Sequence, residues 1–247
     1  VPHRIDEGYG LNPEGLKRLK SQGVRLVVSV DCGISNYQEV ELAQNLGVDV
    51  VIVDHHELPP DLPPAVAILN PHRPDCSFPD KGLSGAGLAF YLIIALRAKL
   101  REVGWFSASE TPDIRRYLDI VTLGTIADMV PLIGVNRILT RRGLVELGGS
   151  TRPGIMALKQ VARIAAGDVG AGQVAFQLGP RINAAGRMDA GLKVVEMLTT
   201  DSHEVALRIA QELDEHNRER QAMEAQVLEE ALSQADADPL LRDRFSI

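Results

Sequence analysis

The sequence has only two cysteines among its 247 residues, Cys32 and Cys76, and neither belongs to a Cys-x-x-Cys pair. It therefore predicts neither a disulfide framework nor a structural zinc site. No apolar run approaches the length that crosses a bilayer, and the first residues lack the apolar stretch of a signal peptide. We therefore expect a cytoplasmic protein with no membrane partner.

The chain also lacks an excess of positive charge. Its 33 acidic residues outnumber its 26 lysines and arginines, which gives a formal net charge of -7. This balance argues against a protein that coats nucleic acid nonspecifically. It still permits nucleic-acid binding through a local arginine cluster and bound metal ions. With 45% hydrophobic residues, the chain can bury a substantial core in one large domain or two small ones.

The most informative stretch is the apolar run at residues 48–53, which ends in Asp54-His55-His56. Its β-branched residues predict a strand that is buried on both faces, as in a parallel sheet. In open α/β sheets, ligands bind at the carboxyl ends of the strands. A carboxylate and two imidazoles at such a point suggest a metal site.

A second strand is predicted at residues 25–30, and it ends at Asp31. Between the two strands, residues 36–46 predict a helix that stops at Gly47. A strand-helix-strand unit with the usual right-handed crossover makes its two strands parallel and close neighbours. We therefore expect Asp31 and the triplet at 54–56 to face one crevice.

The remaining pattern predicts a third strand and several more helices, so the expected fold class is α/β, a parallel sheet flanked by helices with a helical extension and a long interdomain helix. The expected third strand spans 65–69, and the expected helices span 13–20, 88–100, 114–127, 136–147, 154–165 and 201–234. The predicted divisions are a core at 1–150, a helical subdomain with an arginine-rich loop at 151–200, a connecting helix at 201–235 and the start of a further domain at 236–247.

The longest helical signal, at 201–234, opens with Asp201 and Glu204 in the spacing of a capping box. Its middle, residues 214–221, is polar all round, which is typical of a helix that crosses solvent between two packed bodies. Little sequence follows this helix, and the chain opens without a methionine. We therefore expect further residues at both ends.

Three other places carry candidate functional residues. Small residues at 84–87 permit close approach of the backbone to a sheet or to an anion. Asp128 follows the apolar helix at 114–127 and suits either a cap for a neighbouring segment or a metal ligand. The glycine-bounded stretch at 179–189 presents Arg181, Asn183 and Arg187, whose side chains suit phosphate oxygens, while pairing of the arginines with nearby acids is the alternative.

Taken together, four motifs resemble the DHH phosphoesterase superfamily. The motifs are Val30-Asp31-Cys32-Gly33, Asp54-His55-His56, Gly124-Thr125-Ile126-Ala127-Asp128 and Arg181-Ile182-Asn183-Ala184-Ala185-Gly186-Arg187. The last two of them, with Ser84-Gly85-Ala86-Gly87, resemble specifically the RecJ family of bacterial single-strand-specific 5′ to 3′ DNA exonucleases. The resemblance implies two divalent cations, manganese or magnesium, which suit carboxylate and imidazole ligands and promote phosphodiester hydrolysis.

The resemblance also implies a role for each candidate residue. Asp31, His55 and Asp128 match metal ligands, Asp54 matches a residue that orients them, and His56 would contact the scissile phosphate. These four, Asp31, His55, His56 and Asp128, are the predicted catalytic residues. The predicted substrate-binding residues are Arg181, Asn183, Arg187, Ser84, Gly85 and Gly87.

One family motif is expected upstream of Val1. It is an Asp-x-Asp cluster after an opening strand, and it supplies ligands to both metals in the family. A second DNA-binding domain is expected beyond the long helix. We therefore expect the chain as given to hold about half of the coordination sphere and to be weakly active or inactive by itself.

The predicted function is metal-dependent hydrolysis of single-stranded DNA from the 5′ end to mononucleotides, in DNA repair and recombination. The protein is expected to be a monomer, with a helicase or a single-strand-binding protein as candidate partners. One alternative is a DHH-family phosphodiesterase or pyrophosphatase that acts on short oligonucleotides or small phosphate esters. The other is a non-catalytic DNA-binding scaffold, which the retained Asp31, His55, His56 and Asp128 disfavour.

Overall fold

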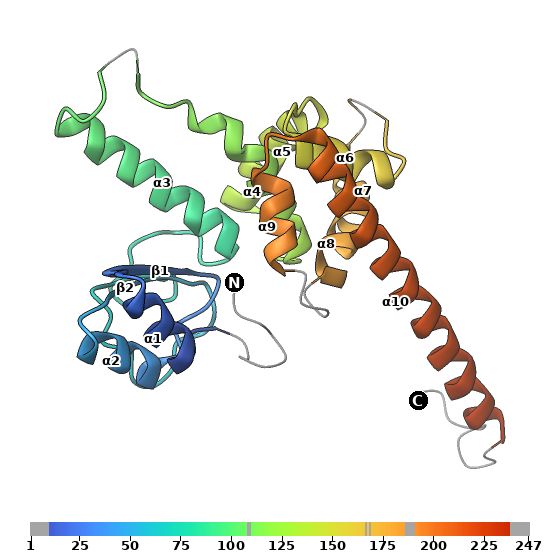
Figure 1. Ribbon diagram of the computed structural model, residues 1–247, viewed down its shortest axis with the longest axis horizontal. Coiled ribbons are helices and arrows are strands. Elements are labelled where there is room, and N and C mark those ends of the chain that lie inside the picture. Colours follow the sequence, from blue (N-terminus) through green and yellow to red (C-terminus); the bar gives the residue numbers. More distant parts are fainter. Residues whose placement is uncertain (1–9, 108–109, 166, 168, 186–190, 238–247) are drawn as a thin grey trace.

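In the computed structural model, residues 10–107, 110–165, 167, 169–185 and 191–237 are described. They form a parallel sheet with helices on both faces, joined to a helical body from which one long helix projects (Figure 1). The predicted α/β class is thereby confirmed. In chain order the elements are α1 (Pro13–Ser21), β1 (Leu26–Val30), α2 (Tyr37–Asn45), β2 (Asp49–Val53), β3 (Ala67–Leu69), α3 (Gly85–Glu102), η1 (Ile114–Tyr117), α4 (Leu118–Ala127), α5 (Gly134–Gly148), α6 (Pro153–Val161), α7 (Ala171–Gln173), the π-helical turn η2 (Val174–Leu178), α8 (Gly179–Ala185), α9 (Gly191–Thr199) and α10 (His203–Ala237).

The sheet of the described residues has three parallel strands in the order β1-β2-β3. Val30 pairs with Val53, and Val53 pairs with Leu69, so all three strands end at the same edge. The residues that directly follow the three strands therefore lie side by side. This is the arrangement that the strand-helix-strand pattern predicts.

Helices cover the two faces of the sheet. Leu16 of α1 and Val40 of α2 are buried in one cluster with Ile52 of β2. On the opposite face, Leu88 of α3 is buried against Val53 of β2. Figure 1 shows α1 and α2 below the sheet and α3 above it. Because α3 also packs on α4, the sheet and the helical body are joined through this helix.

The helical body has its own core between α4, α5, α6, α9 and the first half of α10. Leu147, Leu158, Met197 and Leu213 have almost no exposed surface there. The approach of α5 to α4 requires a glycine, because a Cβ on Gly143 would overlap the side chain of Thr122 and the carbonyl of Leu118. Among the described residues, no helix is both long and apolar enough to cross a membrane.

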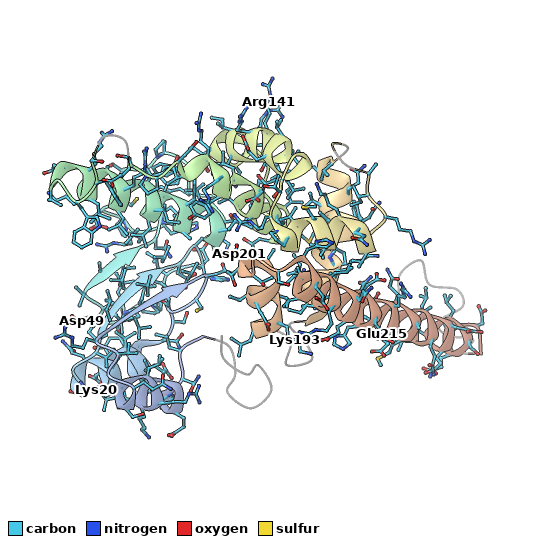
Figure 2. All side chains as sticks on the ribbon, turned by 45° about the horizontal axis from the view of Figure 1, so that its top comes forward. Lys20, Asp49, Arg141, Lys193, Asp201 and Glu215 are labelled. Carbon is cyan, nitrogen blue, oxygen red and sulfur yellow. The ribbon has the colours of Figure 1, made fainter. Side chains whose placement is uncertain are left out.

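The start and the middle of α10 differ from the prediction. The helix begins at His203, and its cap is Ser202, whose Oγ accepts a hydrogen bond from the N–H of Val205 at 3.3 Å. The predicted capping box of Asp201 and Glu204 is therefore wrong. Figure 2 shows side chains extending from both visible edges of the second half of this helix.

The polar stretch in the middle of α10 packs against the body instead of crossing solvent. Asp214 is 4% exposed and Asn217 is 2% exposed. The exposed part of the helix is residues 221–234. The prediction failed because a polar side chain can be buried when it has a partner, and Asp214 has one on α8.

Residues 179–185, the described part of the predicted arginine-rich stretch, form the helix α8, which continues directly from α7 and η2. Gly179 does not break this run, because its backbone is helical; a Cβ there would crowd the carbonyl of Val174 and lie beside Ala127 of α4. Its neighbour Pro180 has no N–H to donate to the preceding turn, and that turn is the π-helical η2 rather than an α-helical one. Helix α9 is also absent from the predicted elements.

Candidate metal centre

Three side chains from three separate segments meet beyond the ends of the strands. Asp31 follows β1, His55 follows β2, and Asp128 follows α4. Nε2 of His55 lies 3.0 Å from Oδ1 of Asp31 and 3.5 Å from Oδ2 of Asp128. The structure thus brings together the three residues that match metal ligands. His56 belongs to the same group, since one ligand atom each from Asp31, His55 and His56 lie within 4.8 Å of one another.

The backbone at Asp31 has an unusual conformation. Its N–H donates to the carbonyl of Val53 at 2.9 Å, which extends the pairing of β1 with β2 by one residue. Its φ of 65° lies in the left-handed region, where few residues other than glycine are found. The chain therefore turns sharply at Asp31, and such conformations cluster at functional sites.

Asp54 organises the turn that carries the two histidines. Its side chain is fully buried and accepts hydrogen bonds from the N–H of Ile34 at 3.0 Å, of His55 at 2.8 Å and of His56 at 3.2 Å. It also lies 2.6 Å from Nδ1 of His56. Burial by itself would raise the pKa of Asp54, but the bonds from Ile34 and His56 lower it below 3.8. The carboxylate therefore stays charged and holds both histidines in place.

The pKa values of two candidate ligands shift toward proton binding. The hydrogen bond to Asp31 raises the pKa of His55 above 6.5 despite its partial burial, and the charge of Asp128 adds to the effect. Burial raises the pKa of Asp128 above 3.8, and the nearby charge of Asp31 acts in the same direction. A group of this kind exchanges its proton for a cation when a metal binds.

The sequence alone is consistent with two roles for Asp128, a cap for a neighbouring segment or a metal ligand. It directly follows the last residue of α4 and keeps a helical backbone conformation, and its carboxylate points toward His55. Met129 follows with a φ of 60° and is 88% exposed. The chain thus turns sharply beside Asp128 as it does at Asp31, and the turn leaves an apolar side chain in solvent next to the site.

The small residues at 84–87 hold α3 in place against the site. Ser84 caps α3 by accepting the N–H of Gly87 at 3.0 Å, and its Oγ lies 2.9 Å from Oγ1 of Thr125 on α4. A Cβ on Gly85 would overlap the carboxylate of Asp31. All three predicted substrate-binding residues here are buried, and Ser84 has no exposed surface, which differs from the expected place on the substrate path.

The three residues predicted to grip DNA phosphates have different positions. Arg181 is paired with Asp214 of α10 at 2.8 Å and donates to the carbonyl of Gln177 at 2.6 Å. The alternative in which Arg181 pairs with an acid is therefore what the structure shows. Asn183 is exposed on α8, and Arg187 lies outside the described residues.

Asn70 contributes to the site and was missed in the sequence. It is 4% exposed and directly follows β3. Its Nδ2 donates to the carbonyl of His56 at 2.9 Å, and its Oδ1 accepts the N–H of His72 at 2.8 Å. The available signal was its position at the end of the third parallel strand, where Asp31 and Asp54 stand in the other two.

Comparison with known proteins gives consistent matches. The family model described as the DHH family, N-terminal domain, matches residues 1–125. The single-stranded-DNA-specific exonuclease RecJ of Escherichia coli K12 is 46% identical over 237 residues, which are 94% of this chain and 41% of that protein. RecJ of Bacillus subtilis 168 is 38% identical over 243 residues, which are 97% of this chain and 29% of that protein.

Solved structures agree with these matches. A crystal structure of exonuclease RecJ bound to manganese superposes with a TM-score of 0.82 at 34% identity and covers 95% of this chain and 57% of that chain. RecJ of Thermus thermophilus in complex with Mn²⁺ gives a TM-score of 0.77 at 34% identity and covers 90% of this chain and 32% of that chain. The chain therefore spans well under two thirds of the length of these relatives.

Proposed function

The chain belongs to the DHH family, and from that membership we propose that it is part of a metal-dependent exonuclease that hydrolyses single-stranded DNA. The relatives that it resembles over 94% of its length carry that activity in their names. The observation that carries the proposal is the convergence of Asp31, His55 and Asp128 from three distant segments on one point.

The residues present fit divalent cations. Two carboxylates are hard oxygen ligands of the kind that Mn²⁺ and Mg²⁺ prefer, an imidazole suits Mn²⁺ better than Mg²⁺, and two of the similar structures hold manganese. We propose that Asp31, His55 and Asp128 hold the ions. When bound, a pair of such ions lowers the pKa of water and stabilises negative charge on the phosphate during hydrolysis.

The chain's own residues orient this chemistry. Asp54 fixes the backbone of His55 and His56 by accepting the N–H of each, and it fixes the ring of His56 through Nδ1. Since the side chain of His56 is 49% exposed, it can meet a phosphate that approaches from solvent, which is the role we propose for it. Asn70 also fixes the backbone of His56 by donating a hydrogen bond to its carbonyl.

Asn183 and Arg187 are proposed to contact the substrate, and so is Arg181. The pairing of Arg181 with Asp214 only partly cancels its charge, because Arg218 shares the same carboxylate. Several parts of the function remain predictions. They are attack from the 5′ end, release of mononucleotides, a role in repair and recombination, a cytoplasmic location, the monomeric state and a helicase or single-strand-binding partner. The proposed divisions at 1–150, 151–200, 201–235 and 236–247 remain predictions as well.

Asp31→Ala tests the proposal. The substitution is made in a version of the chain extended at both ends to the length of its E. coli relative, and Mn²⁺-dependent release of nucleotides from 5′-labelled single-stranded DNA is followed. We expect digestion to be abolished, while the midpoint of thermal unfolding falls only slightly because alanine adopts a φ of 65° less readily than aspartate. Retained digestion would refute the site.

Asp49→Ala provides the matched control. Asp49 is an exposed carboxylate at the opposite end of β2 from the site, where Figure 2 labels it, and its loss should leave digestion intact.

The same assay separates the proposed exonuclease from the two alternative functions. Preferred cleavage of a dinucleotide over a long strand would favour the small-ester phosphodiesterase, and DNA binding without any Mn²⁺-dependent cleavage would favour the scaffold.

A further inference from the structure

Phe176 is an exposed aromatic side chain that the metal site does not explain. The sequence contains 4% aromatic residues, and Phe176 leaves 81% of its surface in solvent. It lies in η2, a π-helical turn, and such turns occur frequently at functional sites. A single exposed apolar residue is common on protein surfaces, so its surroundings decide whether it has a role.

The surroundings place Phe176 beside the proposed site. Both η2 and α8 pack on α4, the helix that ends at Asp128. Gly179, three residues after Phe176, packs directly against Ala127. The guanidinium of Arg181 donates to the carbonyl of Gln177, the residue that follows Phe176. Phe176 therefore lies on a segment that carries a fixed positive group, Arg181, and that contacts the last turn before Asp128.

Two arginines lie on this segment and on the helix that packs against it. Arg181 and Arg218 share the single carboxylate of Asp214, which leaves one positive charge in excess in this group. Asn183 adds an exposed amide on the same short segment. Aromatic rings combined with a positive surface are the composition with which proteins bind single strands, since the rings stack on bases while the positive groups meet the phosphates.

We propose that Phe176 stacks on a base of the single-stranded substrate and thereby positions the strand for the metal site. This inference rests on the proposed function. Because an aromatic ring stacks on any unpaired base, Phe176 binds without sequence preference and selects against a duplex, whose bases are stacked on one another.

The test uses the version of the chain extended at both ends, called unaltered where it carries no substitution. It compares the binding of two ligands by fluorescence anisotropy in EDTA, where no hydrolysis occurs. One ligand is a labelled oligothymidylate of about twelve nucleotides. The other has the same backbone with abasic residues in place of thymidines. We expect Phe176→Ala to weaken binding of the first ligand about ten-fold and to leave binding of the second unchanged. Phe176→Trp should restore the affinity for the first.

Trp105→Ala is the matched control, because Trp105 is also an exposed aromatic residue, at 74%. Trp105 follows the far end of α3. The near end of this helix abuts Asp31, and its 18 residues span about 27 Å, so Trp105 lies far from the site. Its loss should change neither affinity. Equal binding by Phe176→Ala and the unaltered chain would overturn the inference, and so would an equal loss on the abasic ligand. If the unaltered chain does not bind oligothymidylate, the proposed function itself fails, and the inference falls with it.

Discussion

The carboxylate of Asp54, which has no exposed surface, lies 2.6 Å from Nδ1 of His56 and accepts three backbone N–H groups of the surrounding turns. Asp54→Asn would place an amide N–H₂ against some of these donors. We expect a loss of about 2 kcal/mol in the free energy of unfolding, measured with urea, because buried donors lose their acceptor. Asp49→Asn, an exposed change on the same strand, should cost less than about 0.5 kcal/mol.

The difference in unfolding free energy between the unaltered chain and Asp54→Asn should depend on pH. The pKa of Asp54 is lowered below 3.8 in the folded state, so its charge contributes stability that is fully present above 3.8 and is lost as the pH falls through the folded pKa. The difference in unfolding free energy between the unaltered chain and Asp54→Asn should therefore hold at neutral pH and shrink in acid below pH 3.8. A difference that grows in acid would contradict this role.

Gly85→Ala should disturb the metal centre without removing a ligand. A Cβ at this position would overlap the carboxylate of Asp31, so either that side chain or α3 has to move. We expect Mn²⁺ affinity, measured by calorimetric titration, to fall about ten-fold or more. Gly82→Ala is the control, because its Cβ would meet Asp80 at an ordinary 3.7 Å. Equal affinities in the two variants would count against the placement of Asp31.

Mn²⁺ binding should weaken as the pH is lowered. The hydrogen bond to Asp31 raises the pKa of His55 above 6.5, so the imidazole is protonated already near neutral pH and must release that proton to bind a cation. Titrations at a series of pH values should show the affinity falling as the pH drops through a value above 6.5. His72→Ala should leave this profile unchanged, since His72 contributes only its backbone N–H to Asn70. A flat profile would show that His55 is not a ligand.

Asp214→Ala should destabilise the helical body. Asp214 is 4% exposed and pairs with Arg181 of α8 and with Arg218, so its loss leaves a half-buried guanidinium without its carboxylate. We expect a loss of about 3 kcal/mol in urea unfolding. Glu224→Ala removes an exposed carboxylate that is paired with Arg220 further along α10, and it should cost less than about 1 kcal/mol.

Much of the metal site was predictable from local sequence. The β-branched runs before Asp31 and Asp54 identify two strands, and the helix between them makes the strands parallel. Parallel strands end at one edge, so the two carboxylates had to lie near each other. The resemblance to the DHH superfamily then identified Asp128, which local pattern left undecided.

Other features depend on contacts that no local pattern reveals. The pair of Arg181 and Asp214 joins residues 33 positions apart, and it turns a polar stretch of α10 into a buried one. Asn70 resembles an ordinary asparagine of a loop until its contact with His56 is seen. In each case tertiary packing overrode local preference.

The left-handed backbone at Asp31 restricts which amino acids natural variation can place there. Glutamate would keep the negative charge, but its larger side chain adopts a φ near 65° far less readily. Glycine would adopt it freely and remove the ligand, while asparagine would keep the bend and give up the charge. Aspartate alone meets both demands, so substitutions at this position are confined by chain geometry as tightly as by chemistry.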